Sequence, residues 1–374
     1  MLALKKIIIK DSIHGSIVLN ELEERVLDSC AMQRLRKVKQ LALSYLVYPG
    51  ANNTRFEHCL GTFFLAGRMC EEFGIGGEER QELKLAALLH DVGHGAFSHE
   101  SELIFREFKK GGHEENALKM MKGEIGGLLE EKGYFKDTVK LFKNHPIICS
   151  DVGSDRMDYL VRDARFTGVA YGVIDVDRIL KTLVLKEGKL MVDRKGLEAV
   201  ESLLIARFLM FSSVYYHHAV RIASAMLRKA LKMEIELGNL ELDDLLKHGD
   251  GEILYMTRAN PLIKRINERR LYKRAFEINI NEESHGKGNK FDFKKFEREL
   301  LETLEKAKID CSCVIADYPE MMVKPVTISI WDGEEKDLKE LSPLVNSLRS
   351  RISLLVACDE KQKEKVAKEC ERFF

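Results

Sequence analysis

The chain has 374 residues, of which 45% are hydrophobic and 32% charged, and its 60 basic residues balance 60 acidic ones. This length allows one large domain or two, with ample apolar content for a core. The zero formal net charge argues against nucleic acid as a partner, because proteins that bind its phosphate backbone usually carry a basic excess. It is compatible with a small phosphorylated ligand, which needs only a few arginines.

No apolar run approaches the roughly 18 residues that a membrane span requires. The N-terminal sequence also lacks the apolar segment and cleavage site of a secretory signal. The eight cysteines include no CxxC pair and are expected to be reduced thiols. The sequence therefore predicts a cytoplasmic protein without a membrane partner.

The first half of the chain is predicted to be mostly helical. Residues 5–19 predict two short strands about a turn at His14-Gly15, and Thr54 is suited to cap the helix that follows it. Helices are expected over 21–46, 55–73, 82–90, 100–110, 124–132 and 134–143, near 113, and after a turn within 151–163.

The second half predicts a hairpin over 183–193, a very long helix over 197–237 and a helical stretch over 243–271. A basic loop over 282–290 precedes helices at 293–308, 338–350 and 364–373 and strands at 313–316, 326–331 and 352–358. The expected fold is mainly α, with an N-terminal hairpin and a helical core (1–240) and a C-terminal helical and α+β subdomain (241–374).

A histidine-rich segment ends the helix predicted at 82–90. His90 and Asp91 lie at its last turn, and Gly93 and Gly95 let the backbone turn back closely after them. The partial negative charge of a helix C-terminus favours a bound cation. An isolated His-Asp pair is more often a helix cap followed by a turn. The interpretation therefore depends on the other candidate ligands in the sequence.

Four side chains form a candidate metal site: His58, His90, Asp91 and Asp155. Two imidazoles and two carboxylates suit a divalent ion, with Mn, Fe, Zn, Co, Ni and Mg as candidates. Such an ion lowers the pKa of bound water and polarises a phosphoryl oxygen. The purely structural alternative for Asp155 is that it caps a helix whose following polar residues form a solvated face.

Additional polar residues suggest phosphate chemistry around this ion. Three more histidines lie near the candidate ligands in the sequence or follow them, which is more than a structural metal site needs: His94, His99 and His113. Histidine can donate a proton to a leaving group near neutral pH. Arg207 lies in an apolar stretch and requires an anion or a carboxylate as its partner. Three arginines could hold a polyphosphate by paired hydrogen bonds: Arg55, Arg156 and Arg207.

These motifs resemble the HD-domain superfamily of metal-dependent phosphohydrolases. The longer matches are similar to its deoxynucleoside triphosphate triphosphohydrolase (dGTPase-like) branch. They cover residues 5–235 well and the tail loosely, and they lie at 11–15, 33–36, 40–41, 55–58, 90–99, 155–159 and 162–163.

The resemblance implies a helical core in which His58, His90, Asp91 and Asp155 bind a metal such as manganese. It implies hydrolysis of a deoxynucleoside triphosphate (dNTP) at the α-phosphorus, giving a deoxynucleoside and inorganic triphosphate. By the same resemblance, His99 and His113 match histidines beside the scissile bond, His94 is expected to face the phosphates, and Glu102 stands where relatives place an acidic helper. Contacts to sugar or triphosphate are implied for Gln40, Arg55, Arg156, Tyr159, Asp163, Arg207 and Tyr215.

Two departures concern the substrate. Arg156 stands where a mammalian relative has lysine, and Phe211 stands where it has histidine, which removes a polar contact. A second activity therefore stays open, namely hydrolysis of another phosphate ester such as a nucleoside monophosphate. A third alternative is a nucleotide-sensing or nucleic-acid-binding protein with vestigial hydrolysis, although neutral charge and intact metal ligands speak against it.

The resemblance also suggests regulation and assembly. Asp28, Gln33 and Arg36 match residues that bind a guanine nucleotide at a regulatory site between subunits. The alternative is a polar network that fixes the first helices. By analogy, a homo-oligomer is expected, either a dimer or a tetramer.

Overall fold

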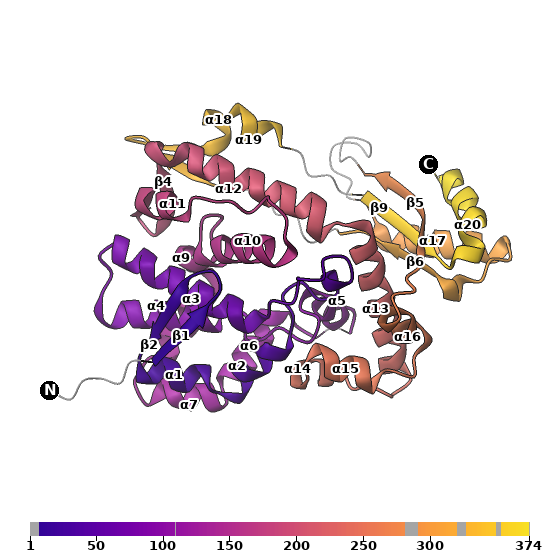
Figure 1. Ribbon diagram of the computed structural model, residues 1–374, viewed down its shortest axis with the longest axis horizontal. Helices are drawn as coiled ribbons and strands as arrows, with labels where there is room; N and C mark the ends of the chain where they lie inside the picture. Colours follow the sequence, from indigo (N-terminus) through magenta and orange to yellow (C-terminus); the bar gives the residue numbers. More distant parts are fainter. Residues whose placement is uncertain (1–6, 109, 281–290, 320–326, 349–352, 374) are drawn as a thin grey trace. The chain divides into compact units, whose positions relative to one another are not determined.

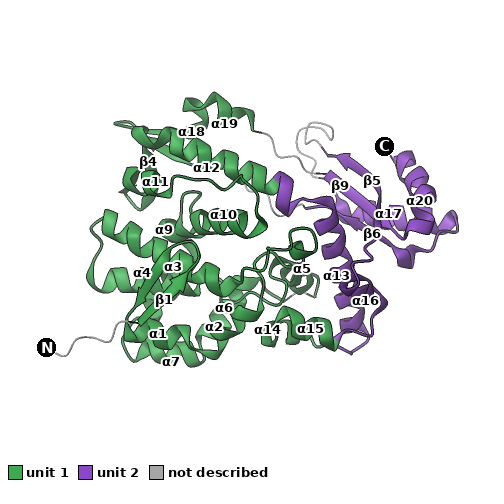
Figure 2. Ribbon diagram, viewed as in Figure 1, with its two compact units in different colours: residues 1–211, 241–256, 326–348 green, residues 212–240, 257–325, 349–374 purple. Residues whose placement is uncertain are grey.

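The computed structural model describes residues 7–108, 110–280, 291–319, 327–348 and 353–373. The chain divides into two compact units, which Figure 2 shows in different colours. Unit 1 comprises residues 1–211, 241–256 and 326–348, and unit 2 comprises residues 212–240, 257–325 and 349–374.

Unit 1 is mainly helical, as predicted. Its helix α3 packs against α4 and α10 (Figure 1). Helix α4 also packs against α8. Its helices are α1 (Glu21–Leu27), α2 (Cys30–Arg34), α3 (Arg55–Glu72), α4 (Gly77–Leu89), α5 (His99–Glu107), α6 (His113–Met121), α7 (Glu124–Glu130), α8 (Phe135–Asn144), α9 (Pro146–Cys149), α10 (Ser154–Thr167), α11 (Val176–Thr182), α12 (Leu197–Met210), α14 (Asp244–Lys247), α15 (Asp250–Met256), α18 (Leu338–Leu341) and α19 (Pro343–Ser347).

Two small sheets belong to unit 1. The predicted N-terminal hairpin is confirmed as β1 (Ile7–Asp11) paired antiparallel with β2 (Gly15–Leu19). The hairpin predicted at 183–193 is also confirmed, and it extends into a four-stranded sheet in which β4 pairs in parallel with β7. The strands, in spatial order, are β3 (Leu183–Lys186), β4 (Lys189–Asp193), β7 (Ser329–Trp331) and β8 (Glu335–Asp337).

Unit 2 combines helices with an antiparallel sheet. Its helices are α13 (His218–Glu236), α16 (Pro261–Asn267), α17 (Phe293–Lys306) and α20 (Lys363–Cys370). The sheet has the order β5 (Lys273–Asn279), β9 (Ser353–Cys358) and β6 (Val314–Asp317). All six residues of the central strand β9 are buried, and Leu300, Leu304 and Val366 pack in the same core.

The boundaries of several predicted helices were wrong. The helix expected over 21–46 ends at Leu27, restarts as α2 and gives way after a 3-10 turn to a bridge between Lys39 and Thr54. The helix expected over 197–237 passes through a π-helical turn at Phe211–Tyr215 and restarts at His218, where His217 Nδ1 accepts a hydrogen bond from Ala219 N. Side-chain caps and bridges stop helices that periodicity alone would continue.

The remaining differences lie in the second half of the chain. The stretch expected to be helical over 243–271 forms three short helices, α14, α15 and α16. The strand predicted over 326–331 is β7, which pairs with β4 in unit 1 and not with the tail sheet. Strand β5 was not predicted, and the loop predicted at 282–290 lies outside the described residues.

Among the described residues, every helix is too short or too polar to pass through a lipid bilayer.

Candidate metal centre

Three of the predicted metal ligands converge in unit 1. His58 lies in the first turn of α3, whereas His90 and Asp91 follow the last residue of α4. One ligand atom from each of the three lies within 4.8 Å of the other two. Asp155, in the first turn of α10, places Oδ1 3.1 Å from His58 Nε2 and 3.8 Å from His90 Nε2. The packing of α3 against α4 and α10 therefore brings distant parts of the chain together.

The hydrogen bonds of the two histidines leave their Nε2 atoms facing each other. His90 Nδ1 lies 2.8 Å from the carbonyl oxygen of Ala87, which can only accept, so Nδ1 carries the hydrogen. His58 Nδ1 lies 2.8 Å from Asp158 Oδ2 and donates in the same way. In the neutral rings both Nε2 atoms are then acceptors, and they lie 3.2 Å apart. Facing lone pairs at this distance call for a cation between them.

The charge balance agrees with this geometry. Burial alone lowers the pKa of His58, but hydrogen bonds with Asp155 and Asp158 and the charges of Asp158 and Asp91 raise it to about 10. Burial opposes ionisation of Asp155, yet His58 and His90 hold its pKa below the usual range. With no other cation bound, a proton would occupy His58, and a divalent ion would displace that proton.

These residues fit a metal ion. Ligands on adjacent coordination sites of an ion with bonds of about 2.1 Å are about 3 Å apart. The distances from His58 Nε2 to His90 Nε2, Asp155 Oδ1 and Asp91 Oδ2 are 3.2, 3.1 and 3.6 Å. The nitrogen and oxygen donors are those that borderline divalent ions prefer. The group can therefore hold such an ion after small adjustments.

A largely buried network behind His58 fixes its orientation, and the sequence had not singled it out for this role. Asp158 accepts hydrogen bonds from His58 Nδ1 and from Nε and Nη2 of Arg162. It also contacts His14 Nε2 at 2.7 Å. Asp11 accepts from the other edge of Arg162, with Nη1 to Oδ2 at 2.7 Å. Gly61 packs so closely that a Cβ there would lie 1.8 Å from Asp158 Oδ1. The only sequence signal was that these residues lie inside the family-like motifs.

The predicted proton-transfer residues form a second cluster. Glu102 Oε2 lies 3.3 Å from His99 Nδ1, and Oε1 lies 3.3 Å from His113 Nδ1. The ring of His94 stacks on that of His113, with centroids 4.3 Å apart. Burial lowers the pKa of His113, but the hydrogen bond and charge of Glu102 outweigh it and raise the pKa. By contrast, burial and the charge of Arg55 hold the pKa of His94 well below its usual range.

Arg55 forms an ion pair with Asp91, one of the predicted metal ligands. Its side chain is buried, pairs with Asp91 and donates from Nε to Ser98 Oγ at 2.7 Å. Ser98 Oγ in turn donates to Lys39 O. Burial raises the pKa of Asp91, but Arg55, His90 and His94 lower it well below its usual range. Arg55 therefore orients a predicted metal ligand, and its own phosphate contact stays a prediction.

Arg156 and Arg207 meet at one carboxylate. Arg207 Nη1 lies 3.0 Å from Asp151 Oδ1, and Arg156 pairs with the same oxygen. The sequence had predicted that Arg207 needs an anion or a carboxylate partner, and Asp151 is that carboxylate. Tyr159 lies within electrostatic reach of both arginines and of Asp155.

The other predicted substrate contacts are distributed more widely. Asp163 Oδ1 accepts from Asn53 Nδ2 at 2.9 Å, and Asn53 O accepts from the backbone N–H of Gln40. The buried Oε1 of Gln40 has no hydrogen-bond partner among the described residues. Tyr215 belongs to unit 2, so its sugar contact stays a prediction.

The residues predicted to bind a regulatory nucleotide form a chain of side-chain contacts. Gln33 Nε2 donates to Leu27 O at 3.0 Å, and its Oε1 accepts from Arg36 Nε at 2.8 Å. Gln33 Nε2 also lies 3.4 Å from Asp28 Oδ1, and the guanidinium of Arg36 stacks on the ring of Phe56. Both the regulatory site and the helix-fixing network remain compatible with this arrangement.

Residues 245–250 hold the histidine-rich turn in place by hydrogen bonds. The sequence analysis did not predict these contacts. Phe97 and Ser98 have positive φ angles of 61° and 54°, which side-chain-bearing residues rarely adopt. The carboxylate of Asp250 accepts two backbone hydrogen bonds, from Phe97 N to Oδ1 at 2.7 Å and from Lys39 N to Oδ2 at 3.0 Å. Leu245 O accepts a third, from Ala96 N. Burial raises the pKa of Asp250 to about 6, although both N–H donors, Lys39 and Arg55 lower it.

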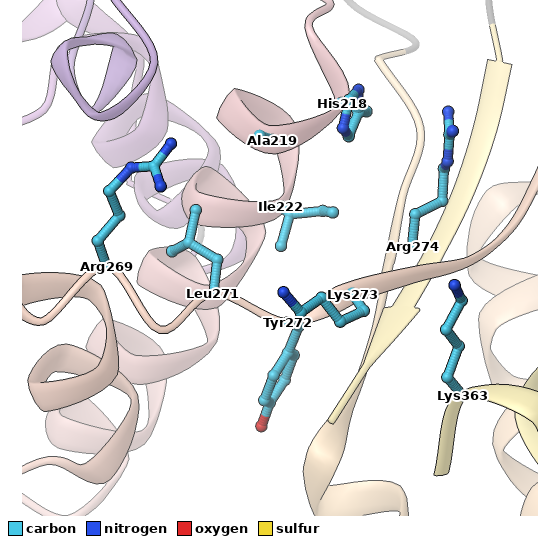
Figure 3. Close-up of a pocket in the computed structure, with 9 residues that line it drawn as sticks. All are labelled: His218, Ala219, Ile222, Arg269, Leu271, Tyr272, Lys273, Arg274 and Lys363. Carbon is cyan, nitrogen blue, oxygen red and sulfur yellow. The ribbon is translucent and has the colours of Figure 1, made fainter. Parts of the chain in front are cut away.

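Unit 2 contains a separate cavity of about 310 Å³ (Figure 3). Four of its lining side chains are cationic, and none of its lining residues was a predicted site residue: His218, Ala219, Ile222, Arg269, Leu271, Tyr272, Lys273, Arg274 and Lys363. Burial, followed by the charge of Arg274, lowers the pKa of His218. The cavity is therefore cationic even though its histidine is neutral near pH 7.

Comparison with known proteins identifies the family. Residues 55–150 match the HD domain, and residues 174–374 match the HD associated region. The chain belongs to the HD-domain family. An uncharacterized protein of Methanocaldococcus jannaschii is 38% identical over 91% of this chain and 76% of its own length.

Two further relatives bear on function. The HD-domain chain is 28% identical to the deoxynucleoside triphosphate triphosphohydrolase of Bos taurus over 71% of this chain and 58% of that protein. A phosphohydrolase structure from Bacteroides thetaiotaomicron is similar with a TM-score of 0.76 and 25% identity, covering 95% of this chain and all of that one. The predicted resemblance to HD phosphohydrolases is thus confirmed.

Replacing Asp158 with asparagine should weaken metal binding. Asparagine has one accepting oxygen in place of the two that meet His58, Arg162 and His14, and it lacks the negative charge, so the His58 tautomer is held less firmly. We expect affinity for Mn²⁺ or Zn²⁺ to fall about 10- to 100-fold in competition titrations with a chromophoric chelator. Asp177→Asn, which removes the exposed partner of Arg68, is the control. Unchanged affinity in a folded Asp158→Asn protein would contradict the role.

Asp250 should make stability depend on pH. Its folded pKa, about 6, exceeds the ordinary value of 3.8, so its contribution is fully present below pH 4 and is lost as the pH rises through 6. The stability of wild type relative to Asp250→Asn should fall by roughly 2 to 3 kcal/mol over this range. Urea unfolding of both proteins from pH 3.5 to 7 measures it.

The control for this experiment is the exposed Asp243, whose pKa is lowered by Lys110. Asp243→Asn should give a smaller slope of the opposite sign. A pH-independent difference between wild type and Asp250→Asn would refute the assignment.

Proposed function

We propose that the chain is a metal-dependent dNTP triphosphohydrolase that releases a deoxynucleoside and inorganic triphosphate. The observation that carries the proposal is the metal-binding geometry of His58, His90, Asp91 and Asp155 next to the Glu102 cluster. The similarity to the triphosphohydrolase of Bos taurus supports the choice of substrate.

The chain's own side chains suit the required proton transfer. In the proposed reaction, a water oxygen forms a bond to the α-phosphorus, and the bond from this phosphorus to the 5′ oxygen breaks. A divalent ion held by the four ligands would supply an activated water and polarise a phosphoryl oxygen. His113, whose pKa is raised by Glu102, would give a proton to the departing 5′ oxygen. His99 lies on the other oxygen of Glu102 and is exposed enough to exchange protons with solvent.

Substrate binding would fall to the remaining polar residues. Arg156 and Arg207 would contact phosphate oxygens, and His94, whose pKa is lowered, would meet the phosphates as a neutral ring. Gln40, Tyr159, Asp163 and Tyr215 would complete the sugar and phosphate contacts, with Arg55 acting through Asp91.

A second candidate is hydrolysis of a less charged phosphate ester, such as a nucleoside monophosphate. It is favoured by Asp151, which already neutralises part of the charge of Arg156 and Arg207. Phe211, whose ring lies 5.7 Å from the Arg207 guanidinium, adds no polar contact of its own side chain.

Assembly and regulation are proposed by analogy. The chain would form a homodimer or homotetramer in the cytoplasm, where its eight free cysteines remain reduced. A guanine nucleotide could then bind at Asp28, Gln33 and Arg36.

The reaction type can be tested directly. Purified protein loaded with Mn²⁺ should release inorganic triphosphate from a dNTP, detected by ion chromatography. In ¹⁸O-labelled water the label should enter the triphosphate, because the bond to phosphorus is the one that forms. Asp91→Ala should remove both metal and activity. Release of only pyrophosphate or orthophosphate from dNTPs would refute the reaction, and orthophosphate from monophosphates would favour the second candidate.

Replacing Glu102 with glutamine should slow turnover without removing the metal. The pKa of His113 is raised by Glu102, so its loss should lower that pKa and shift the alkaline decline of kcat to lower pH. We expect kcat to fall about 100-fold near neutral pH, measured as a full pH-rate profile with metal content.

The matched control is Glu114→Gln, which neutralises an exposed carboxylate next to His113 in sequence that pairs with Lys143. It should leave the profile unchanged. An unshifted profile in Glu102→Gln would show that Glu102 does not set the protonation of His113.

A further inference from the structure

Asp151 lies between the two arginines assigned to phosphate. It precedes α10, which carries Arg156, while Arg207 lies on α12. One oxygen, Oδ1, faces both guanidinium groups and lies 3.0 Å from Arg207 Nη1. The other oxygen, Oδ2, accepts from the backbone N–H of Thr327 at 2.7 Å. The carboxylate is thus held by three separate parts of the fold.

The three charged side chains share a poorly hydrated environment. The side chains of Asp151, Arg207 and Arg156 are 5%, 11% and 16% exposed. Burial, followed by the charge of Arg207, lowers the pKa of Arg156, so the two cations act on each other. Two buried positive charges close together are tolerated because a negative charge lies between them. The three side chains together therefore carry a net charge of +1.

We propose that Asp151 is an internal counter-anion that competes electrostatically with phosphate for Arg156 and Arg207, and so limits how much phosphate charge the site accepts. This rests on the proposed function in one respect, namely that both arginines face the substrate's phosphates. Phosphate oxygens and a carboxylate use the same guanidinium donors, so an oxygen already on Nη1 reduces what remains for substrate. Because Thr327 N also holds Asp151, the carboxylate stays beside the arginines when phosphate binds.

The sign of the effect distinguishes this role from that of a simple brace. If Asp151 competes, a neutral residue leaves the buried arginines without a countercharge, and a bound anion then supplies it, so anion affinity rises. If Asp151 only positions the arginines, a neutral residue disorders them and anion affinity falls. The gain should grow with the charge of the ligand, because the repulsion that is removed is proportional to it.

Binding of inorganic phosphates to the full-length, metal-depleted protein tests the proposal without turnover. We expect Asp151→Asn to bind inorganic triphosphate about tenfold more tightly than wild type at low salt, with a smaller gain for orthophosphate, by isothermal titration calorimetry. Asp151→Ser offers a second neutral residue able to accept from Thr327 N, and Asp151→Glu retains the charge and should keep the wild-type preference. Equal or weaker triphosphate binding by the folded neutral variants would overturn the proposal.

Two controls separate this result from other effects. Glu23→Gln neutralises another buried carboxylate, which pairs with Lys84 at 2.6 Å, and should not alter phosphate affinity. Arg207→Gln should weaken triphosphate binding more in the Asp151→Asn background than in wild type, and an equal loss in both would refute the competition. Failure to release triphosphate from dNTPs would reject the proposed reaction while leaving these binding measurements decisive for Asp151.

Discussion

Asp158 carries a negative charge at a point where its side chain is completely shielded from solvent. Such a charge is tolerable only when donors surround it, and here they come from the turn after β1, from α3 and from α10. The same contacts that compensate the charge fix His58, so metal-ligand orientation and helix packing have one cause. Gly61 belongs to this arrangement because any side chain there would occupy the position of the carboxylate.

Charges of opposite sign alternate outward from this point. Asp11 compensates Arg162 behind Asp158, and on the far side of the histidines Asp91 is compensated by Arg55. Each of these buried ions therefore has a hydrogen-bonded partner of opposite charge. Such pairing offsets the cost of burying charge, but removal of one member leaves the other uncompensated. A cation bound between the Nε2 atoms of His58 and His90 would continue the alternation.

Much of the site could be predicted because its signals are local. The helical periods around His58 and His90 and the glycines after Asp91 indicated helix ends and ligand types, and the longer motifs identified the family. Asp250 and Thr327 could not be found this way, because they reach the site through long-range contacts that leave no period in the sequence. The pairing of β4 with β7 has the same origin, since its partners are distant in sequence.

The charge count at the site constrains the substrate. Asp91 and Asp155 would balance a divalent ion, Arg55 is already paired with Asp91, and His113 is paired with Glu102. In the proposed reaction, attraction for phosphate would then come from Arg156 and Arg207, less the charge of Asp151. A phosphate monoester, with a charge of about −1.5 to −2 near pH 7, exceeds this remainder only slightly, whereas a triphosphate exceeds it by more. In the proposed reaction, a triphosphate would therefore bind together with its own counter-ions. Its affinity would then depend on the divalent cation concentration more steeply than the affinity of a monophosphate would.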